Sequence, residues 1–298
     1  MRYRDFIEDW FEIDDAKTGE LVPCKLNKTQ RKYYEGLVND YGIERGLAVP
    51  AREIILKARR QGFSSLVLAL FAADDILSEH ATETHVISYK DEATKIFTKR
   101  YKGYVKAYFR KRWGVMDEGR IWAVDNGNEL ILRHNGARFY CGTASARTAG
   151  RGGVVHKLLF SEIAHYPDVE RITAREMVEG TLRQVDINAG WVFAETTANG
   201  YGNHFEKMWS LASGGLSRFK PRFYGWREFY TQEEFGVIAS EFTDKQILKQ
   251  EYPETPEEAF ISTGSSYFDN EKILEYMKRS LEPLYLASIS YEDKLVRY

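Results

Sequence analysis

Residues 53–65 read EIILKARRQGFSS and join an apolar strand to an apolar helix through a short basic loop. The strand occupies residues 53–56, and the helix begins at Ser64 and continues to Leu77. A strand, a glycine-containing loop and a helix in this order are typical of a phosphate-binding loop, or P-loop, in which backbone N–H groups at the helix N-terminus face an anion. The stretch therefore predicts an α/β nucleotide-binding domain.

The lysine of this loop is displaced. The usual pattern is G-x-x-x-x-G-K-[ST]. When the sequence is aligned on Gly62 and Ser64, Lys57 replaces the first glycine of the pattern and Phe63 replaces its lysine. Because a P-loop curls around its ligand, an ammonium group at position 57 can approach the same phosphates from the other end of the loop. The alternative is a basic strand-to-helix turn whose charges are only solvated.

Other side chains of the loop suit a nucleotide. Arg59 and Arg60 carry guanidinium groups that can make bidentate contacts with phosphate. Gly62 allows close approach of the backbone, and the Ser64 hydroxyl stands where a Mg²⁺ ligand is expected. We therefore expect the nucleotide to be held by Lys57, Arg59, Arg60, Gln61, Gly62, Phe63, Ser64 and Ser65.

A second half of the site follows the apolar strand at residues 158–160. Walker B strands usually end in Asp and then Glu, whereas this strand ends in Ser161 and Glu162. Ser161 would be a neutral, weaker partner of Mg²⁺, acting through water. Glu162 would be the general base that orients and polarises the attacking water. The alternative is an ordinary carboxylate that happens to follow a strand.

A glycine-rich loop at residues 142–153 carries Arg147 and Arg151. An arginine on such a loop is a candidate arginine finger, acting in cis or across a subunit interface, and Arg151 is the preferred candidate. The alternative is a solvent loop that needs its glycines only for positive φ angles.

Two further segments are candidates for nucleotide contact. Residues 194–200 follow an apolar strand with Thr196, Thr197 and Asn199, and small hydroxyl side chains at a strand end can sense a γ-phosphate. Gln30 precedes the P-loop and offers the donor and acceptor that an adenine edge requires. The alternative is that Asn27 caps a helix and leaves Gln30 exposed.

The remaining pattern predicts a mostly parallel sheet with helices on both faces, because strands at 53–56, 85–88, 158–160 and 191–194 alternate with helices. Residues 120–132 predict an antiparallel hairpin around the Asn126-Gly127 turn. We expect an ATPase core over residues 1–214 and a smaller, mainly helical linker subdomain over 215–298. Capping boxes beginning at Thr231 and Thr255 mark helix starts in this second part.

Composition excludes several classes of protein. Lys+Arg is 42 and Asp+Glu is 44, so the net charge of −2 (42 − 44) does not indicate a histone-like basic coat. Two cysteines make no disulfide framework, and the longest apolar stretch, residues 66–73, is too short to span a bilayer. We expect an intracellular protein without a membrane segment.

A basic, aromatic segment covers residues 90–113, with nine Lys/Arg against two acids. On a helix it could place a basic stripe against DNA phosphates, in contacts that weaken as salt rises. The favoured alternative is that the aromatic residues face the core and the basic residues face solvent, because their spacing of three and four is what packing needs.

The order of these motifs, ending in Tyr252-Pro253 and residues 257–260 (EEAF), resembles the terminase large subunit family, the DNA-packaging motors of tailed phages and related viruses. The resemblance runs from about Leu26 to Asp269, and family members are known with the lysine at the start of the loop. It implies a RecA/ASCE-like P-loop ATPase that uses ATP and Mg²⁺. It also implies an adenine contact by Gln30, phosphate and Mg²⁺ contacts by Lys57, Arg60, Gly62 and Ser64, catalysis by Glu162, and a coupling motif of Thr196, Thr197 and Asn199.

The function that the resemblance implies is ATP hydrolysis that drives double-stranded DNA into a procapsid. The implied partners are a portal protein and a small terminase subunit. A homo-oligomeric ring is implied during packaging, in the host cell cytoplasm, with a monomer as the alternative for the isolated chain. No acidic cluster follows residues 267–269, so we expect no nuclease activity. Alternatives are a helicase-like DNA-dependent ATPase, which would need a second RecA-like domain, and a non-catalytic nucleotide-binding domain.

Overall fold

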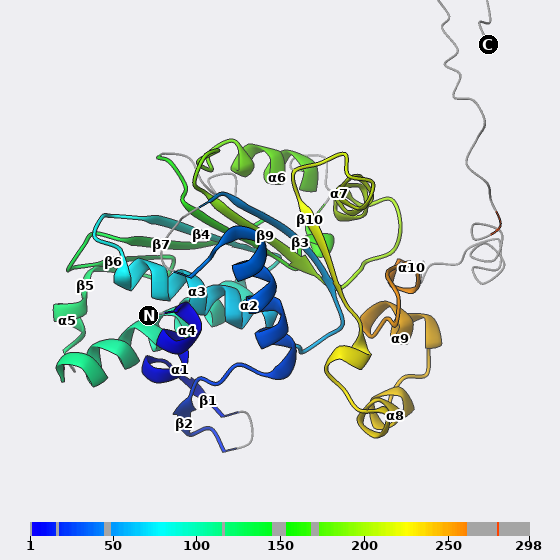
Figure 1. The fold of residues 1–298 in the computed structure, drawn as a ribbon, viewed down its shortest axis with the longest axis horizontal. Helices are drawn as coiled ribbons and strands as arrows, with labels where there is room; N and C mark the ends of the chain where they lie inside the picture. The colour runs from blue at the N-terminus through cyan, green and yellow to red at the C-terminus, as the bar shows by residue number, and fades with distance from the viewer. Residues whose placement is uncertain are drawn as a thin grey trace, which may run out of the picture. The chain divides into compact units, whose positions relative to one another are not determined.

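The computed structural model describes residues 2–15, 18–44, 49–114, 117–144, 153–167, 173–260 and 279. The chain divides into two units, Met1–Ile261 and Ser262–Tyr298, and the elements below all belong to the first. Its centre is an eight-stranded sheet with the strand order β10-β3-β9-β8-β4-β7-β6-β5 (Figure 1).

Six neighbouring strands of this sheet are parallel. They are β3 (Ala51–Lys57), β4 (Glu83–Ser88), β7 (Arg138–Thr143), β8 (Lys157–Ser161), β9 (Trp191–Thr196) and β10 (Lys220–Tyr224). Every residue of β8 and β9 is buried, which is the pattern of parallel strands covered on both faces. The predicted strands at 53–56, 85–88, 158–160 and 191–194 lie in β3, β4, β8 and β9 and are confirmed.

The antiparallel hairpin extends one edge of the same sheet. It consists of β5 (Trp122–Asp125) and β6 (Glu129–Leu132), and β6 then pairs antiparallel with β7. The Asn126 side chain shapes the turn by accepting hydrogen bonds from the backbone N–H groups of Asn128 and Glu129. The predicted hairpin is therefore confirmed.

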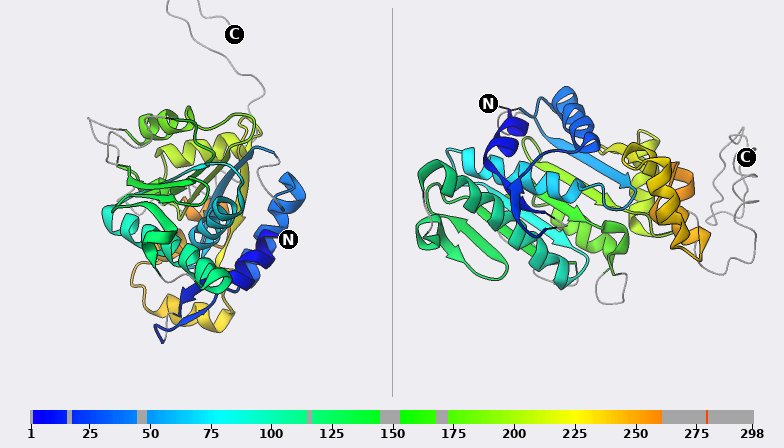
Figure 2. Two further views of the ribbon diagram at one scale, coloured as in Figure 1. Left: turned by 90° about the vertical axis from the view of Figure 1, so that its left-hand side faces the viewer. Right: turned by 90° about the horizontal axis from the view of Figure 1, so that it is seen from below.

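Helices cover both faces of the sheet (Figures 1 and 2). One face carries α1 (Tyr3–Trp10), α2 (Lys28–Tyr41), α3 (Phe63–Leu77) and α4 (Asp91–Trp113), and the other carries α6 (Ala174–Leu182) and α7 (His204–Ser213). Each layer encloses its own apolar core cluster. The short elements are the hairpin β1 (Glu12–Asp14) and β2 (Leu21–Pro23), helix α5 (Glu118–Ile121), and the 3₁₀ turns η1 (Ile163–His165) and η2 (Trp226–Glu228).

Helix α4 contains the basic, aromatic segment. Its buried side chains include Phe97, Tyr101, Tyr104 and Phe109, and the Tyr101 ring stacks on Phe139 with centroids 4.0 Å apart. The interpretation that the aromatic residues face the core is therefore confirmed. Many of the basic residues form ion pairs with acids of β1, α5 and β5, namely Lys99 with Asp14, Lys102 with Asp125, Lys106 with Glu118, and Arg110 with Glu12. A DNA contact by this helix remains a prediction.

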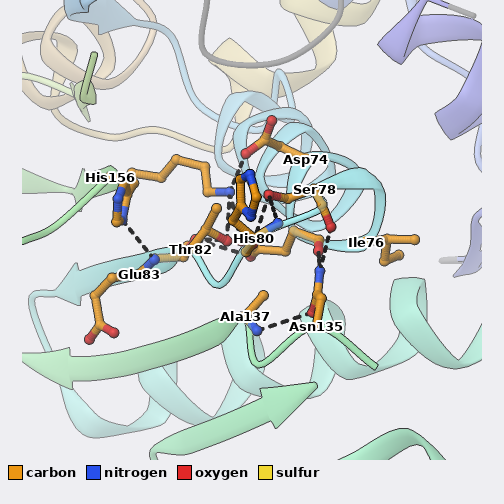
Figure 3. A network of polar contacts seen from close by, with 12 residues as sticks. Asp74, Ile76, Ser78, His80, Thr82, Glu83, Asn135, Ala137 and His156 are labelled. Atoms are coloured by element: carbon orange, nitrogen blue, oxygen red, sulfur yellow. Dashed lines mark hydrogen bonds and ion pairs between the residues drawn. The ribbon is translucent and has the colours of Figure 1, made fainter. Parts of the chain in front are cut away.

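A buried ion cluster fixes the end of α3 against the sheet. Lys157, at the start of β8, is fully buried and pairs with Asp74 and with Asp75 Oδ1, the latter at 2.6 Å. Figure 3 shows the surrounding network, in which Asn135 donates a hydrogen bond to the Ser78 carbonyl and His156 accepts one from the Glu83 N–H. Because α3 starts at the P-loop and β8 leads to Glu162, the cluster joins the far ends of both site-bearing elements.

The chain after residue 214 differs from the expected arrangement. β10 lies in this part of the chain and is an edge strand of the central sheet, so the sheet extends past the predicted boundary. Of its five residues, KPRFY, only Tyr224 is buried. The strand therefore lacks the alternation of buried and exposed side chains that would mark it in the sequence. The helices α8 (Gln232–Ser240), α9 (Lys245–Glu251) and α10 (Pro256–Ala259) follow. The exact boundary at 214 remains a prediction.

The predicted helix starts in this part are largely confirmed. Thr231 and Glu234 form a reciprocal capping box at α8. Thr255 caps α10 by accepting a hydrogen bond from the Glu258 N–H, and Pro256 opens the helix. The Glu258 carboxylate accepts from the Glu254 N–H instead of completing the box. Within the described ranges, no helix combines the length and apolarity needed to cross a membrane.

Candidate nucleotide site

The loop between β3 and α3 has the conformation expected of a phosphate-binding turn. Arg60 and Gly62 both have positive φ angles, of 62° and 80°. For Gly62 this conformation costs little, whereas for Arg60 it is strained. A Cβ atom at position 62 would lie 2.7 Å from Gln30 Nε2, so the Gln30 side chain would have to move to make room for it.

Lys57 lies at the centre of the site. Its side chain is 6% exposed, and its Nζ atom lies 3.0 Å from Glu162 Oε1 and 3.1 Å from Glu195 Oε2. Burial alone would lower the pKa of Lys57, but the two carboxylates outweigh it and raise the pKa above its ordinary value. The ammonium group is therefore charged at neutral pH.

The two ends of the loop converge, as the displaced-lysine interpretation requires. Ser64 lies at the start of α3, and its Oγ atom donates a 2.7 Å hydrogen bond to Glu195 Oε1. Lys57 pairs with the other oxygen of the same carboxylate. Glu195 thus connects the position of the displaced lysine to the position of the expected Mg²⁺ ligand. The phosphate contact itself remains a prediction.

Glu162 has backbone and side-chain features that suit a catalytic carboxylate. Its φ angle is 54°, a left-handed conformation that non-glycine residues adopt at a cost and that clusters at functional sites. Its Oε2 atom accepts hydrogen bonds from the Thr197 N–H at 3.2 Å and from Thr196 Oγ1 at 3.3 Å. Burial raises the pKa of a carboxyl group, but the Lys57 ammonium outweighs it and lowers the pKa of Glu162 below its ordinary value.

The predicted coupling residues surround Glu162. Besides the contacts from Thr196 and Thr197, Asn199 Nδ2 donates to the Ala164 carbonyl at 3.1 Å and holds the turn that follows Glu162. His165 Nε2 lies 3.3 Å from Thr197 Oγ1, and burial lowers the pKa of this histidine. The end of β9 is therefore physically connected to the carboxylate at the end of β8.

No protein-family model matches the sequence, and no curated protein matches it. Solved structures do match its fold. The large terminase of bacteriophage HK97 superimposes with a TM-score of 0.57 and 14% identity, covering 84% of this chain and 50% of that one. A mutant of the Thermus phage P74-26 large terminase ATPase domain gives a TM-score of 0.51 and 13% identity, covering 76% of this chain and 93% of that one.

The chain has the fold of a phage large terminase ATPase domain. A third match is the large terminase of a thermophilic bacteriophage in complex with ATP-γ-S, with a TM-score of 0.50 and 12% identity over 76% of this chain. Two of these three proteins are much longer than the matched region, since the chain spans about half the length of each. The expected P-loop fold, a mostly parallel sheet flanked by helices, is confirmed.

Two side chains of the loop between β3 and α3 point away from the expected ligand. Gln61 is fully buried, and its Nε2 atom donates to the carbonyls of Tyr224 and Gly225. Phe63 packs against Tyr33 and Tyr224, with ring centroids 5.2 and 4.7 Å apart. Both side chains therefore serve the core, and only the backbone groups of these residues remain for a ligand. Nucleotide contacts by Gln61 and Phe63 remain a prediction.

Gln30 supports the P-loop with its side-chain amide. Its Oε1 atom accepts a hydrogen bond from the Asn27 N–H, which completes a capping box at the start of α2. Its Nε2 atom donates to the Gly62 carbonyl at 2.7 Å. Both polar atoms of the amide thus support the P-loop, and each keeps capacity for one more hydrogen bond. The adenine contact remains a prediction. The alternative that Asn27 caps the helix is confirmed, although Gln30 is half-buried.

The arginines of the loop are placed differently from one another. Arg59 Nε pairs with Glu251 Oε2 at 2.7 Å, and the Arg59 N–H donates to the Glu251 carbonyl, so this residue connects the loop to α9. Burial raises the pKa of Glu251. Arg60 is exposed and has no hydrogen bond or ion pair to any described residue. Arg147 and Arg151 lie outside the described residues.

The last loop residue borders a groove. Ser65 Oγ accepts a hydrogen bond from Arg100 Nη1 of α4 at 2.9 Å. A groove of about 1540 Å³ runs from Gly62 and Ser65 along α4, and Arg60 and Gln30 also line it. Lys57, Glu162 and Glu195 are not among its described lining residues. The groove therefore lies beside the P-loop, and the ion-pair cluster lies behind it.

Glu195 is the site residue that sequence reasoning missed. It is fully buried in β9, whose other residues are apolar or threonine. A charged residue inside such a strand must be paired, because burying an unpaired charge is very costly. That contrast within WVFAET was the available signal. Its partners, from β3, β8 and α3, could not be inferred from it.

Proposed function

We propose that the chain binds ATP with Mg²⁺ and hydrolyses it, and that hydrolysis drives double-stranded DNA into a viral procapsid. The observation that carries the proposal is the convergence of Lys57, Ser64 and Glu162 at the carboxyl ends of β3 and β8. Ligands of open α/β sheets bind at these strand ends. The fold shared with phage large terminases, one of them in complex with ATP-γ-S, supports the nucleotide as the ligand.

Phosphate binding would use the loop backbone and Lys57. The N–H groups at the start of α3 carry the partial positive charge of a helix N-terminus and attract phosphate oxygens. Lys57 would turn from the two carboxylates to the phosphates, while Ser64 would offer its hydroxyl to Mg²⁺. The metal would neutralise phosphate charge when bound. The exposed Arg60 would add a further guanidinium contact.

Glu162 would act on the attacking water. Because its pKa lies below the ordinary value, the carboxylate is ionised at neutral pH and can accept a hydrogen bond or a proton. Its hydrogen bonds from Thr196 and Thr197 fix its direction and would transmit changes at the γ-phosphate to β9. We also propose Arg151, with Arg147 as the alternative, as an arginine finger.

The proposal extends to the assembly in which the chain would act, and the terminase-like fold supports this part. It includes double-stranded DNA, a homo-oligomeric ring, a portal protein and a small terminase subunit, all in the host cell cytoplasm. A linear double-stranded DNA that raises the ATPase rate of the protein would support the DNA-dependent part. A rate that does not respond to DNA at low salt would count against it.

A steady-state ATPase assay tests the catalytic part. Glu162→Gln keeps the shape of the side chain and removes its basicity, so kcat should fall by roughly 10²- to 10⁴-fold. Glu79→Gln is a matched control, because Glu79 is an exposed acid just after α3, at the far end of that helix. Absence of turnover in the wild type, or full activity in Glu162→Gln, would contradict the proposed function.

A further inference from the structure

The acid missing from the end of β8 has a counterpart on the next strand. Ser161 occupies the position where a Walker B strand usually has Asp. In the parallel pairing of β8 with β9, the register partner of Ser161 is Glu195. Adjacent residues in register place their side chains on the same face of a sheet. Glu195 therefore presents a carboxylate on the same face of the sheet, one strand away from Ser161.

The contacts of Glu195 direct it to the metal position of a P-loop. Its Oε1 atom accepts hydrogen bonds from Ser64 Oγ at 2.7 Å and from Ser161 Oγ at 2.6 Å. Its Oε2 atom pairs with Lys57 Nζ at 3.1 Å, so a cation already lies beside this oxygen. When Lys57 turns to the phosphates, as proposed above, this buried carboxylate oxygen loses its cation and can take Mg²⁺ in its place.

The residues present fit magnesium. Among the described residues, no group of three or more His, Cys, Asp or Glu side chains could hold a metal ion. Magnesium in nucleotide sites does not need such a group, since it usually takes one or two protein carboxylates together with substrate phosphates and water. A serine hydroxyl and one carboxylate, Ser64 and Glu195, match that requirement.

We propose that Glu195 is the carboxylate of the Mg²⁺ site and takes the place of an acid at position 161. Ser161 is a positioning residue that holds Glu195 through its hydroxyl. This inference rests on the proposed function, because it names the metal ligand of the same nucleotide site. It revises the expectation that Ser161 itself is the partner of the metal.

The test is the Mg²⁺ dependence of ADP binding, measured by calorimetry over a MgCl₂ series and in EDTA. In Glu195→Gln, the Mg²⁺ concentration that gives half of the increase in ADP affinity should rise by at least about tenfold, as expected when the shell of a metal is disturbed. ADP affinity in EDTA should change little. In Ser161→Ala the rise should be clearly smaller, because the carboxylate remains.

Two further variants complete the design. Glu53→Gln is the matched control, because Glu53 is a fully buried carboxylate of β3 that pairs with Arg222, at the opposite end of the strand from Lys57. Its Mg²⁺ requirement should equal that of the wild type. The double variant Ser161→Asp/Glu195→Gln returns an acid to β8 and should recover much of the lost Mg²⁺ response. It also retains a negative partner for Lys57 if Glu195→Gln alone does not fold.

The outcomes separate the two proposals. A wild-type Mg²⁺ requirement in folded Glu195→Gln would overturn the assignment of Glu195 and leave the ATPase proposal intact. A Ser161→Ala variant with as large a rise as Glu195→Gln would overturn it as well, in favour of Ser161. No binding of ADP by the wild type in any condition would overturn the proposed function and this inference together.

Discussion

Replacing Lys57 by methionine removes the only cation that the structure places, among its described residues, between Glu162 and Glu195. The substitution keeps the apolar stem and leaves two buried or half-buried carboxylates without their partner. Breaking a buried ion pair by removing one member costs about 3–5 kcal/mol. For a domain of this size each kcal/mol lowers Tm by roughly 2–4 °C, so a decrease of about 10 °C is expected near neutral pH.

The loss should depend on pH in a stated direction. In the wild type, the lowered pKa of Glu162 stabilises the folded protein at pH values above the pKa of this group in the unfolded chain. The stabilisation is lost as the pH falls through the lower pKa of Glu162 in the folded protein. In Lys57→Met the Glu162 carboxylate loses the cation that lowers its pKa, so burial, which raises this pKa, favours its protonation. The variant should therefore approach the wild type in Tm as the pH falls from 7.5 towards 5.

Thermal unfolding by circular dichroism at both pH values measures this effect, and ADP titration at pH 7.5 measures the loss of phosphate binding. Lys95→Met is the control, because Lys95 is an exposed lysine of α4 without an ion pair to any described residue. A Lys57→Met variant with wild-type Tm at pH 7.5, or with a deficit that is the same at both pH values, would refute the reasoning.

Three other substitutions have expected outcomes. Phe63→Lys in a Lys57→Ala background places a lysine where the usual P-loop pattern has one. It should not restore ATPase activity, because the side chain at position 63 enters an aromatic cluster. Recovered turnover would contradict the observed loop geometry. Gly62→Ala should weaken ADP binding in calorimetry by roughly 1–2 kcal/mol, or about 5- to 30-fold, because of its positive φ and its contact with Gln30; unchanged affinity would contradict this. Lys157→Met should lower the free energy of unfolding in urea by about 3–5 kcal/mol, and a change under about 1 kcal/mol would show that the buried cluster is not a stabilising ion pair.

The fold was largely predictable because its signals are local. Residues 53–77 contain a short and a long apolar run, and the loop between them contains the glycine that a tight turn needs. The hairpin after Trp122 and the cap at Thr231 are likewise encoded by neighbouring residues. β10 escaped notice because an edge strand need not be apolar, and its partner β3 lies far away in the sequence.

The site was only partly predictable because its chemistry depends on register between distant strands. Lys57 and Glu162 follow recognisable strands, so their positions could be inferred. The pairing of Ser161 with Glu195 depends on how β8 aligns with β9, which no local pattern specifies. The side-chain contacts of Phe63 and Gln30 could not be inferred for a related reason, since alignment with a motif gives the position of a residue but not the direction of its side chain.

The most direct test of the account is a crystal structure of the protein with Mg²⁺ and ATP-γ-S. The account predicts that Lys57 Nζ lies within hydrogen-bonding distance of the terminal phosphate group, with Glu162 on the side from which water attacks. An amine that remains between Glu162 and Glu195, with no other cation beside the terminal phosphate, would contradict it.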